Sequence, residues 1–204
     1  MDVLVTDPKT GKATGLTRTV RRALRAMEAS GVHYSVIDAT ALAVRGLPRM
    51  TRHLDLVVSA EQAPEARRAL AAAGLEARTP VGTQDEPEPM VVFVDPRTEV
   101  EVDLLAAVGD PEATVIDEAT RAEVFGVSAP VASLEHLLLM YLYSNQPKHL
   151  GDFAAIVGSG LADLAQTERL LAGMHAEMLP DWRRRVADAK SPPAPPPRPP
   201  RRGR

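Results

Sequence analysis

Strand-like and helix-like segments are unevenly distributed along this sequence of 204 residues. Short apolar or alternating runs, which favour strands, all lie before residue 106, whereas the segments after Ser133 show only helical spacing. Strands followed by a helical region are typical of an α+β fold. We therefore expect a mixed β-sheet of roughly four to six strands, with a C-terminal helical region that covers one side of it.

The expected elements follow from apolar spacing and from turn residues. The strand segments are 3–5, 34–37, 54–58, 91–94 and 99–105, and the last two are joined by a turn at 95–98. The helix segments are 16–29, 39–45, 61–73, 133–143, 147–157, 162–174 and 181–189. Together they predict an α/β core over 1–130, a helical region over 131–190 that packs on the core, and a tail over 191–204.

Composition excludes several classes of protein. The chain has no cysteine, so disulfide frameworks, thiolate zinc clusters and thiol nucleophiles are excluded. The first residues, MDVLVTDPKT, lack the basic start and apolar run of a secretory signal, and the longest apolar stretch, 137–143, is far shorter than a membrane span. We expect a cytoplasmic protein with no membrane contact.

The last fourteen residues, SPPAPPPRPPRRGR, combine seven prolines with four arginines. Proline prevents helix and ladder hydrogen bonds, so this tail is predicted to be extended or disordered. Its arginines could bind RNA or an acidic partner, although a simple solubilising tail fits the same composition. The net charge of the whole chain, with this basic tail included, is −3. The residues before the tail are therefore negatively charged and unsuited to coating nucleic acid.

The most informative part of the sequence is GVHYSVIDATALAVRGLPRMTRHLDLVV, residues 31–58, together with VEVDLL at 100–105. On a strand, His53 and Asp55 are two residues apart and face the same side, and Asp103 on a later strand can add a second carboxylate. The order of these elements resembles the minimal nucleotidyltransferases of the DNA-polymerase-beta-like superfamily. The AbiEii-like group, associated with toxin–antitoxin and abortive-infection systems, is the most similar.

This resemblance implies a site for an NTP and a divalent metal ion, magnesium or manganese. Asp55 and Asp103 would be the catalytic carboxylates, and the metal ligands would be these two residues with His53. The residues expected to contact the nucleotide are Asp38, Ala39, Thr40, Arg49, Thr51 and Lys148. The reaction would move a nucleoside monophosphate onto a hydroxyl group of RNA, a protein or a small molecule.

The sequence departs from the family pattern at the most demanding positions. Asp38 and Ala39 stand where the family has Gly-Gly, and His53 replaces the first acid of the Asp-x-Asp pair. The family's Lys-Asp-Leu-x-Asp segment reads KHLGD at 148–152, so only its lysine, its leucine and its last acid, Asp152, match. Magnesium prefers oxygen ligands, whereas imidazole suits manganese, zinc or iron. We therefore expect any cation bound here to prefer manganese or zinc to magnesium.

Two hypotheses account for these departures. In the first, Asp38 and His53 neutralise each other in a cleft that has lost nucleotide binding. The protein is then a pseudoenzyme and acts as a binding or regulatory subunit, for example with a protein partner in a defence or toxin–antitoxin assembly. In the second, His53, Asp55 and Asp103 form an altered single-metal site, which Asp38 could join as an extra ligand, and nucleotidyl transfer survives with manganese. We favour the first hypothesis because the glycine pair and a metal-bridging acid are lost together.

The retained polar residues also have structural interpretations. Arg49 can pair with a carboxylate, Thr51 can cap the turn into the strand, and Asp103 can be a solvent-facing residue of an amphipathic strand. Lys148 and His149 are expected in the first turn of an exposed helix.

Three aromatic residues on the late helices could be mistaken for a platform that stacks on a nucleotide base. We expect Tyr141, Tyr143 and Phe153 to pack in the core instead.

Overall fold

The computed structural model describes residues 12–79 and 89–191. The strand expected at 3–5 lies outside the described residues, and so does the tail from 192 onward. The predictions of RNA and partner binding through that tail therefore stay predictions. Among the helices of the described segments, none is both long and apolar enough to cross a membrane.

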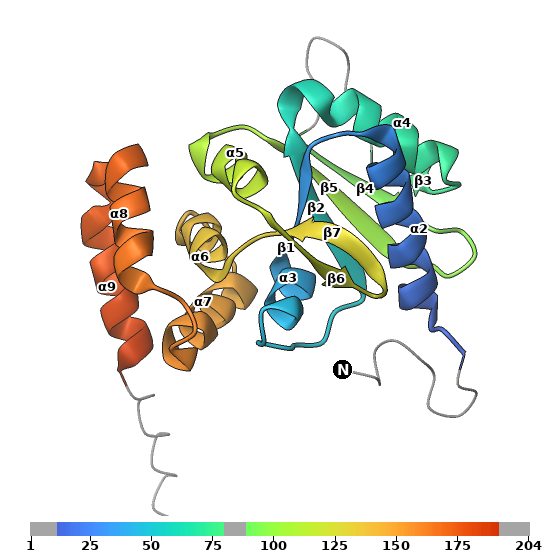
Figure 1. Ribbon diagram of the computed structural model, residues 1–204. Coiled ribbons are helices and arrows are strands. Elements are labelled where there is room, and N and C mark those ends of the chain that lie inside the picture. Colours follow the sequence, from blue (N-terminus) through green and yellow to red (C-terminus); the bar gives the residue numbers. More distant parts are fainter. Residues whose placement is uncertain (1–11, 80–88, 192–204) are drawn as a thin grey trace, which may run out of the picture.

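A seven-stranded mixed sheet forms the centre of the molecule (Figure 1). Its strands are β1 (Tyr34–Ile37), β2 (His53–Ser59), β3 (Glu76–Ala77), β4 (Met90–Val94), β5 (Glu101–Ala107), β6 (Thr120–Val124) and β7 (Val127–Val131). The spatial order is β3-β4-β5-β2-β1-β7-β6, in which β2 runs parallel to β5 and β1 runs parallel to β7. The mixed sheet expected from the sequence is confirmed, but four to six strands was too few.

Helices cover both faces of this sheet. They are α2 (Gly15–Ser30), α3 (Asp38–Val44), α4 (Ala63–Ala72), α5 (Asp110–Asp117), α6 (Leu134–Leu142), α7 (Pro147–Ser159), α8 (Leu164–Met174) and α9 (Leu179–Lys190), with short 3-10 turns at Ala60–Gln62 and Ala176–Met178. Helices α2 and α4 contact each other on one face, and α5 and α6 lie on the other (Figure 1). Helices α7, α8 and α9 pack around α6 and form the helical end of the molecule.

Strand β2 is central, and this position explains its sequence. Residues Leu54 through Val58 are all buried, because β5 and β1 flank the strand and helices cover both faces. The strand expected at 54–58 is therefore confirmed in its position, and all five of its residues are buried. Continuous apolar runs are typical of strands buried on both faces. Asp55 is the acidic residue within this buried run.

The β6–β7 hairpin was missed in the sequence. Its strands are joined by Phe125 and Gly126, both with positive φ, 49° and 82°. Two consecutive left-handed residues are the signature of a tight hairpin turn, which usually carries Asn-Gly or Asp-Gly. Here phenylalanine takes the first position and Pro130 lies within β7, so both usual signals for a hairpin are weakened.

The helical end has its own aromatic centre. Trp182 of α9 and Phe153 of α7 are each 1% exposed, and their rings meet edge to face with centroids 5.7 Å apart. Arg185 of α9 donates to the backbone carbonyl oxygens of Tyr141 at 2.8 Å and Ser144 at 3.0 Å, which holds the end of α6.

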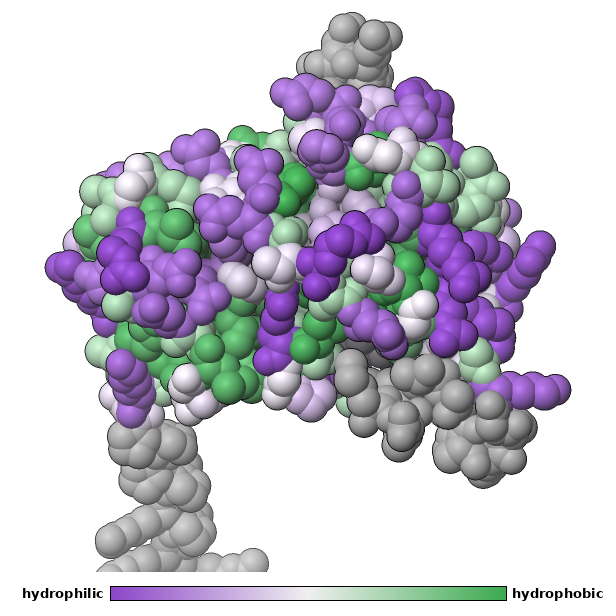
Figure 2. All heavy atoms as spheres, in the orientation of Figure 1, coloured by the Kyte–Doolittle hydropathy of each residue, from purple (hydrophilic) through white to green (hydrophobic). Residues whose placement is uncertain are grey.

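On the face that Figure 2 shows, hydrophobic residues lie in patches among hydrophilic ones.

Ser133 is the N-cap of helix α6, as the sequence predicts. The Ser133 side chain accepts a hydrogen bond from the backbone N–H of His136 at 3.2 Å. Loss of such a cap typically costs about 1 kcal/mol of stability. We expect Ser133→Ala to lower the free energy of unfolding by about 1 kcal/mol in urea denaturation, and Ser133→Asp, which can still cap, to lose less. Equal losses in the two variants would argue against the cap.

Candidate functional site

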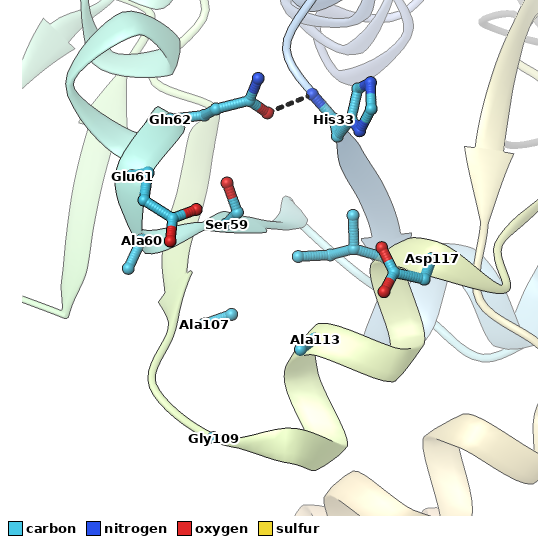
Figure 3. A pocket seen from close by; sticks show the side chains of 10 residues that line it. His33, Ser59, Ala60, Glu61, Gln62, Ala107, Gly109, Ala113 and Asp117 are labelled. Atoms are coloured by element: carbon cyan, nitrogen blue, oxygen red, sulfur yellow. Dashed lines mark hydrogen bonds between the residues drawn. The ribbon is translucent and has the colours of Figure 1, made fainter.

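Two hollows lie near opposite ends of β2 and β5. The larger, of about 690 Å³, is found where both strands end. Figure 3 shows His33, Glu61 and Asp117 around it, with the backbone N–H of His33 donating to Gln62 Oε1 at 2.7 Å. These three lining residues are exposed, and exposed charges interact weakly because water screens them. The side chains around this hollow therefore have the same environment as other surface residues.

The smaller hollow, of about 290 Å³, lies beside the acids of β2 and β5, and we call it the cleft. Its lining residues come from β1, α3, β2, β4, β5, α6, the segment between α6 and α7, and the start of α7: Ile37, Asp38, Asp55, Leu56, Met90, Asp103, Leu105, Leu137, Met140, Tyr141, Ser144, Gln146, Lys148 and His149. Polar groups converge on one end of a mostly apolar hollow, which is typical of a ligand site.

Asp55 and Asp103 are Cα partners in the parallel pair of β2 and β5, and both line the cleft. The sequence prediction that these two acids lie on adjacent strands is confirmed. His53 is two residues before Asp55, and its Nε2 atom lies 3.3 Å from Asp55 Oδ2. The period of two residues along β2 therefore brings the imidazole to the same carboxylates.

Asp38 is the most heavily bonded residue of the cleft. Its backbone φ is 51°, in the left-handed region that favours glycine. Its side chain is only 6% exposed. Oδ1 accepts hydrogen bonds from Tyr141 Oη at 2.7 Å and Arg49 Nη2 at 2.9 Å, and Oδ2 accepts one from Lys148 Nζ at 3.2 Å. One carboxylate thus holds the loop after α3, helix α6 and helix α7 together.

Arg49 has a second acidic partner. Its Nε atom lies 3.0 Å from Asp152 Oδ2 on α7, so the guanidinium bridges two buried carboxylates. Lys148 lies in the first turn of α7 as expected, but its ammonium group points back to Asp38. Both cations expected to bind a nucleotide are therefore engaged within the protein.

The acids of the cleft differ in how readily they ionise. Burial, together with the nearby charges of Asp38 and Asp103, raises the pKa of Asp55 to about 8. Burial also raises the pKa of Asp103. Burial opposes ionisation of Asp38 as well, but the hydrogen bond from Tyr141 and its two cationic partners outweigh burial, and the pKa of Asp38 is lowered. Neighbouring acids whose pKa values are pushed apart are typical of functional sites.

Other residues expected at the site lie outside it. Ala39 and Thr40 are buried in α3 and neither lines the cleft. Thr51 donates its hydroxyl to the carbonyl oxygen of His53 at 3.0 Å, which fits its structural interpretation as a turn residue. The mutual neutralisation of Asp38 and His53 was also wrong in its pairing, because Asp38 pairs with the two cations and His53 pairs with Asp55.

The aromatic residues follow the core prediction in part. Phe153 and Tyr141 are buried, but the Tyr141 hydroxyl reaches into the site. Tyr143 is 44% exposed, so its assignment to the core was wrong. Its helical spacing gave no sign that α6 ends there.

Sequence reasoning missed two further polar residues of the cleft. The ring of His149 stacks on that of Tyr141 with centroids 4.8 Å apart, and its Nδ1 lies 2.6 Å from Ser144 Oγ. Burial lowers the pKa of His149. The only signal was the position of His149 beside Lys148 in the KHLGD segment, where the resembled family has an acid.

No family model and no curated protein matches the sequence. Two solved structures of the antibiotic-resistance factor ANT(2'')-Ia are similar to this chain. The solution structure gives a TM-score of 0.54 at 17% identity and covers 84% of this chain and 93% of that chain. The structure in complex with adenylyl-2''-tobramycin gives 0.53 at 16% identity, over 79% of this chain and 97% of that chain. At such identity the likeness concerns the fold alone, and the chain has a nucleotidyltransferase-like fold.

Proposed function

We propose that this protein is a nucleotidyltransferase-like pseudoenzyme, whose cleft no longer accepts an NTP and which acts as a binding or regulatory subunit. The observation that carries the proposal is the position of the Asp38 carboxylate. It lies between Arg49 and Lys148, the two cationic side chains that would otherwise meet phosphate oxygens.

An NTP can use these cations only by displacing Asp38. The displaced carboxylate would remain in a nearly buried position without its partners. Separating a fully buried ion pair typically costs about 3 to 5 kcal/mol, and the cost here is smaller because Arg49 and Lys148 are partly exposed. A cost of about 2 kcal/mol would already lower the affinity by roughly 30-fold. Asp55 and Asp103 add further negative potential when ionised, which also disfavours a triphosphate.

A second function is favoured by the register of Asp55 with Asp103. Two carboxylates on adjacent parallel strands could hold a divalent ion, manganese or magnesium, beside an NTP. The ion would neutralise charge on the phosphates during transfer of a nucleoside monophosphate to a hydroxyl group. In this alternative Asp38 must leave its partners whenever nucleotide binds.

The test compares the unmodified protein with Asp38→Gly in calorimetric titrations with each NTP, in magnesium and then in manganese. Glycine suits the φ of 51° and removes the carboxylate that lies between the two cations. We expect no binding to the unmodified protein and a gain of at least about 30-fold in affinity for Asp38→Gly. A triple variant that also carries Ala39→Gly and His53→Asp should gain more.

Asp38→Asn is the matched control, because it keeps the shape and removes the charge. It should bind NTP more weakly than the glycine variant, since the amide still fills the space between the cations. NTP binding by the unmodified protein, with labelled product that Asp55→Ala abolishes, would establish the second function in place of the first.

A further inference from the structure

Three potential ligand atoms lie close together beside the cleft, two of them on residues that line it, Asp38 and Asp55. They come from Asp38, His53 and Asp55 and lie within 4.8 Å of one another. Two of these residues follow the same face of β2, and the third comes from the turn that begins α3. The fold thus brings one imidazole and two carboxylates to a single point.

Several of the atoms at this point lack a hydrogen-bond partner. Among the described residues, Asp55 Oδ2 and His53 Nε2 contact only each other, 3.3 Å apart, and neither these two atoms nor Asp103 Oδ1 forms a hydrogen bond, although all three atoms are buried. Asp55 is 8% exposed and lines the cleft. More than about nine in ten buried polar groups have a partner in native proteins. An imidazole nitrogen and two carboxylate oxygens that form no hydrogen bond here fit a ligand that accepts electron pairs from nitrogen and oxygen.

The spacing of the His53 and Asp55 atoms fits a metal ion. His53 Nε2 and Asp55 Oδ2 are 3.3 Å apart. Two ligands at the usual zinc distances of about 2.0 to 2.2 Å, in tetrahedral geometry, lie roughly 3.4 Å from each other. Asp38 Oδ2 accepts a single hydrogen bond among the described residues and keeps a lone pair for the ion.

The ligand set does not fit the pair of magnesium ions that the resembled fold implies. Magnesium takes oxygen ligands in octahedral geometry, and His53 offers nitrogen where a bridging oxygen would be needed. Imidazole with carboxylates is a common set for zinc and its neighbours in the transition series. We propose that the cleft binds one divalent transition-metal ion, of which zinc is the type, through His53, Asp55 and Asp38. This inference rests on the proposed function, and it names the ligand of a cleft that does not bind NTP.

The test titrates the full-length, chelator-treated protein with zinc, and separately with magnesium, without any nucleotide. We expect one zinc ion per chain with a dissociation constant of about 10 μM or tighter, and no magnesium binding at comparable concentrations. Cobalt, as a spectroscopic substitute, should give visible absorption bands of a low-coordinate site that zinc removes. A zinc affinity no better than that for magnesium would overturn the proposal.

Variants locate the ion. His53→Ala should weaken zinc binding by at least about 30-fold, and His53→Asp should shift the preference toward magnesium. The matched control is His33→Ala, which removes an exposed histidine at the other hollow and should leave zinc binding unchanged. Asp55→Asn serves as a second ligand variant in case His53→Ala does not fold. Zinc binding that survives both ligand variants would also refute the site, whereas NTP binding by the unmodified protein would refute the proposed function and leave the zinc result standing.

Discussion

Replacing Asp95 with alanine is expected to lower the free energy of unfolding by about 3 kcal/mol at neutral pH. Asp95 lies in the turn between β4 and β5 and is 1% exposed. It accepts a hydrogen bond from the Thr19 hydroxyl at 2.6 Å, forms an ion pair with Arg22, and accepts the backbone N–H of Arg97 at 3.0 Å. Alanine would leave these donors without an acceptor and would remove the contacts between α2 and the hairpin. Urea denaturation measures the loss.

The effect of Asp95 should depend on pH. Burial opposes its ionisation, but the bonds from Thr19, Arg22 and the turn outweigh burial and hold the pKa of Asp95 well below its usual range. A carboxyl whose pKa is lowered by folding contributes stability above its unfolded pKa, near 3.9, and loses it as the pH falls below that value. The difference between the two proteins should therefore shrink below about pH 4.

An exposed acid provides the control. Asp117 of α5 is exposed, and Asp117→Ala should change stability by less than about 0.5 kcal/mol. If Asp95→Ala costs no more than this control, Asp95 does not join α2 to the hairpin.

The sequence predicted the turn at Asp95 but not the residues that bond to Asp95. The same holds elsewhere in the molecule, where local features were predicted and long-range contacts were not. Turn residues, caps and strand period act over a few positions, so the 95–98 turn, the Ser133 cap and the facing of His53 with Asp55 could all be read locally. The α2 helix was placed to within one residue at each end, because Thr14 and Gly31 cap it. These features depend on residues that are neighbours in the sequence, so they can be predicted without the fold.

The chemistry of the cleft depends on contacts that no local pattern reveals. Asp38 meets Tyr141 and Lys148, which are 103 and 110 residues away in the chain. From sequence alone Asp38 was a negative charge placed beside incoming phosphates, and its natural partner appeared to be His53. Arg49 follows α3 closely in the chain, but only the packing of α6 and α7 brings Tyr141 and Lys148 to the Asp38 carboxylate.

The second large effect concerns the acid of β2. Asp55→Asn is expected to make the metal-free protein more stable than the unmodified protein at pH 8, on the order of 5 kcal/mol. Burial and neighbouring acids raise the pKa of Asp55 to about 8, so the folded state keeps a proton that the unfolded chain releases near pH 4. Between these values stability falls as the pH rises, by up to about 1.4 kcal/mol per pH unit. Asparagine keeps the shape and carries no such penalty.

Denaturation of both proteins from pH 4 to pH 8, in the presence of a chelator, gives the comparison. The two stabilities should be similar at the acid end and diverge as the pH rises, whereas Asp117→Asn should follow the unmodified protein throughout. An Asp55→Asn variant that is no more stable at pH 8 would show that folding does not raise the pKa of Asp55.

An acid that lowers stability near neutral pH is typical of a binding site, because residues that contact a ligand are often unfavourable for the stability of the fold. If the same substitution gains stability and loses zinc, both effects are located in one side chain.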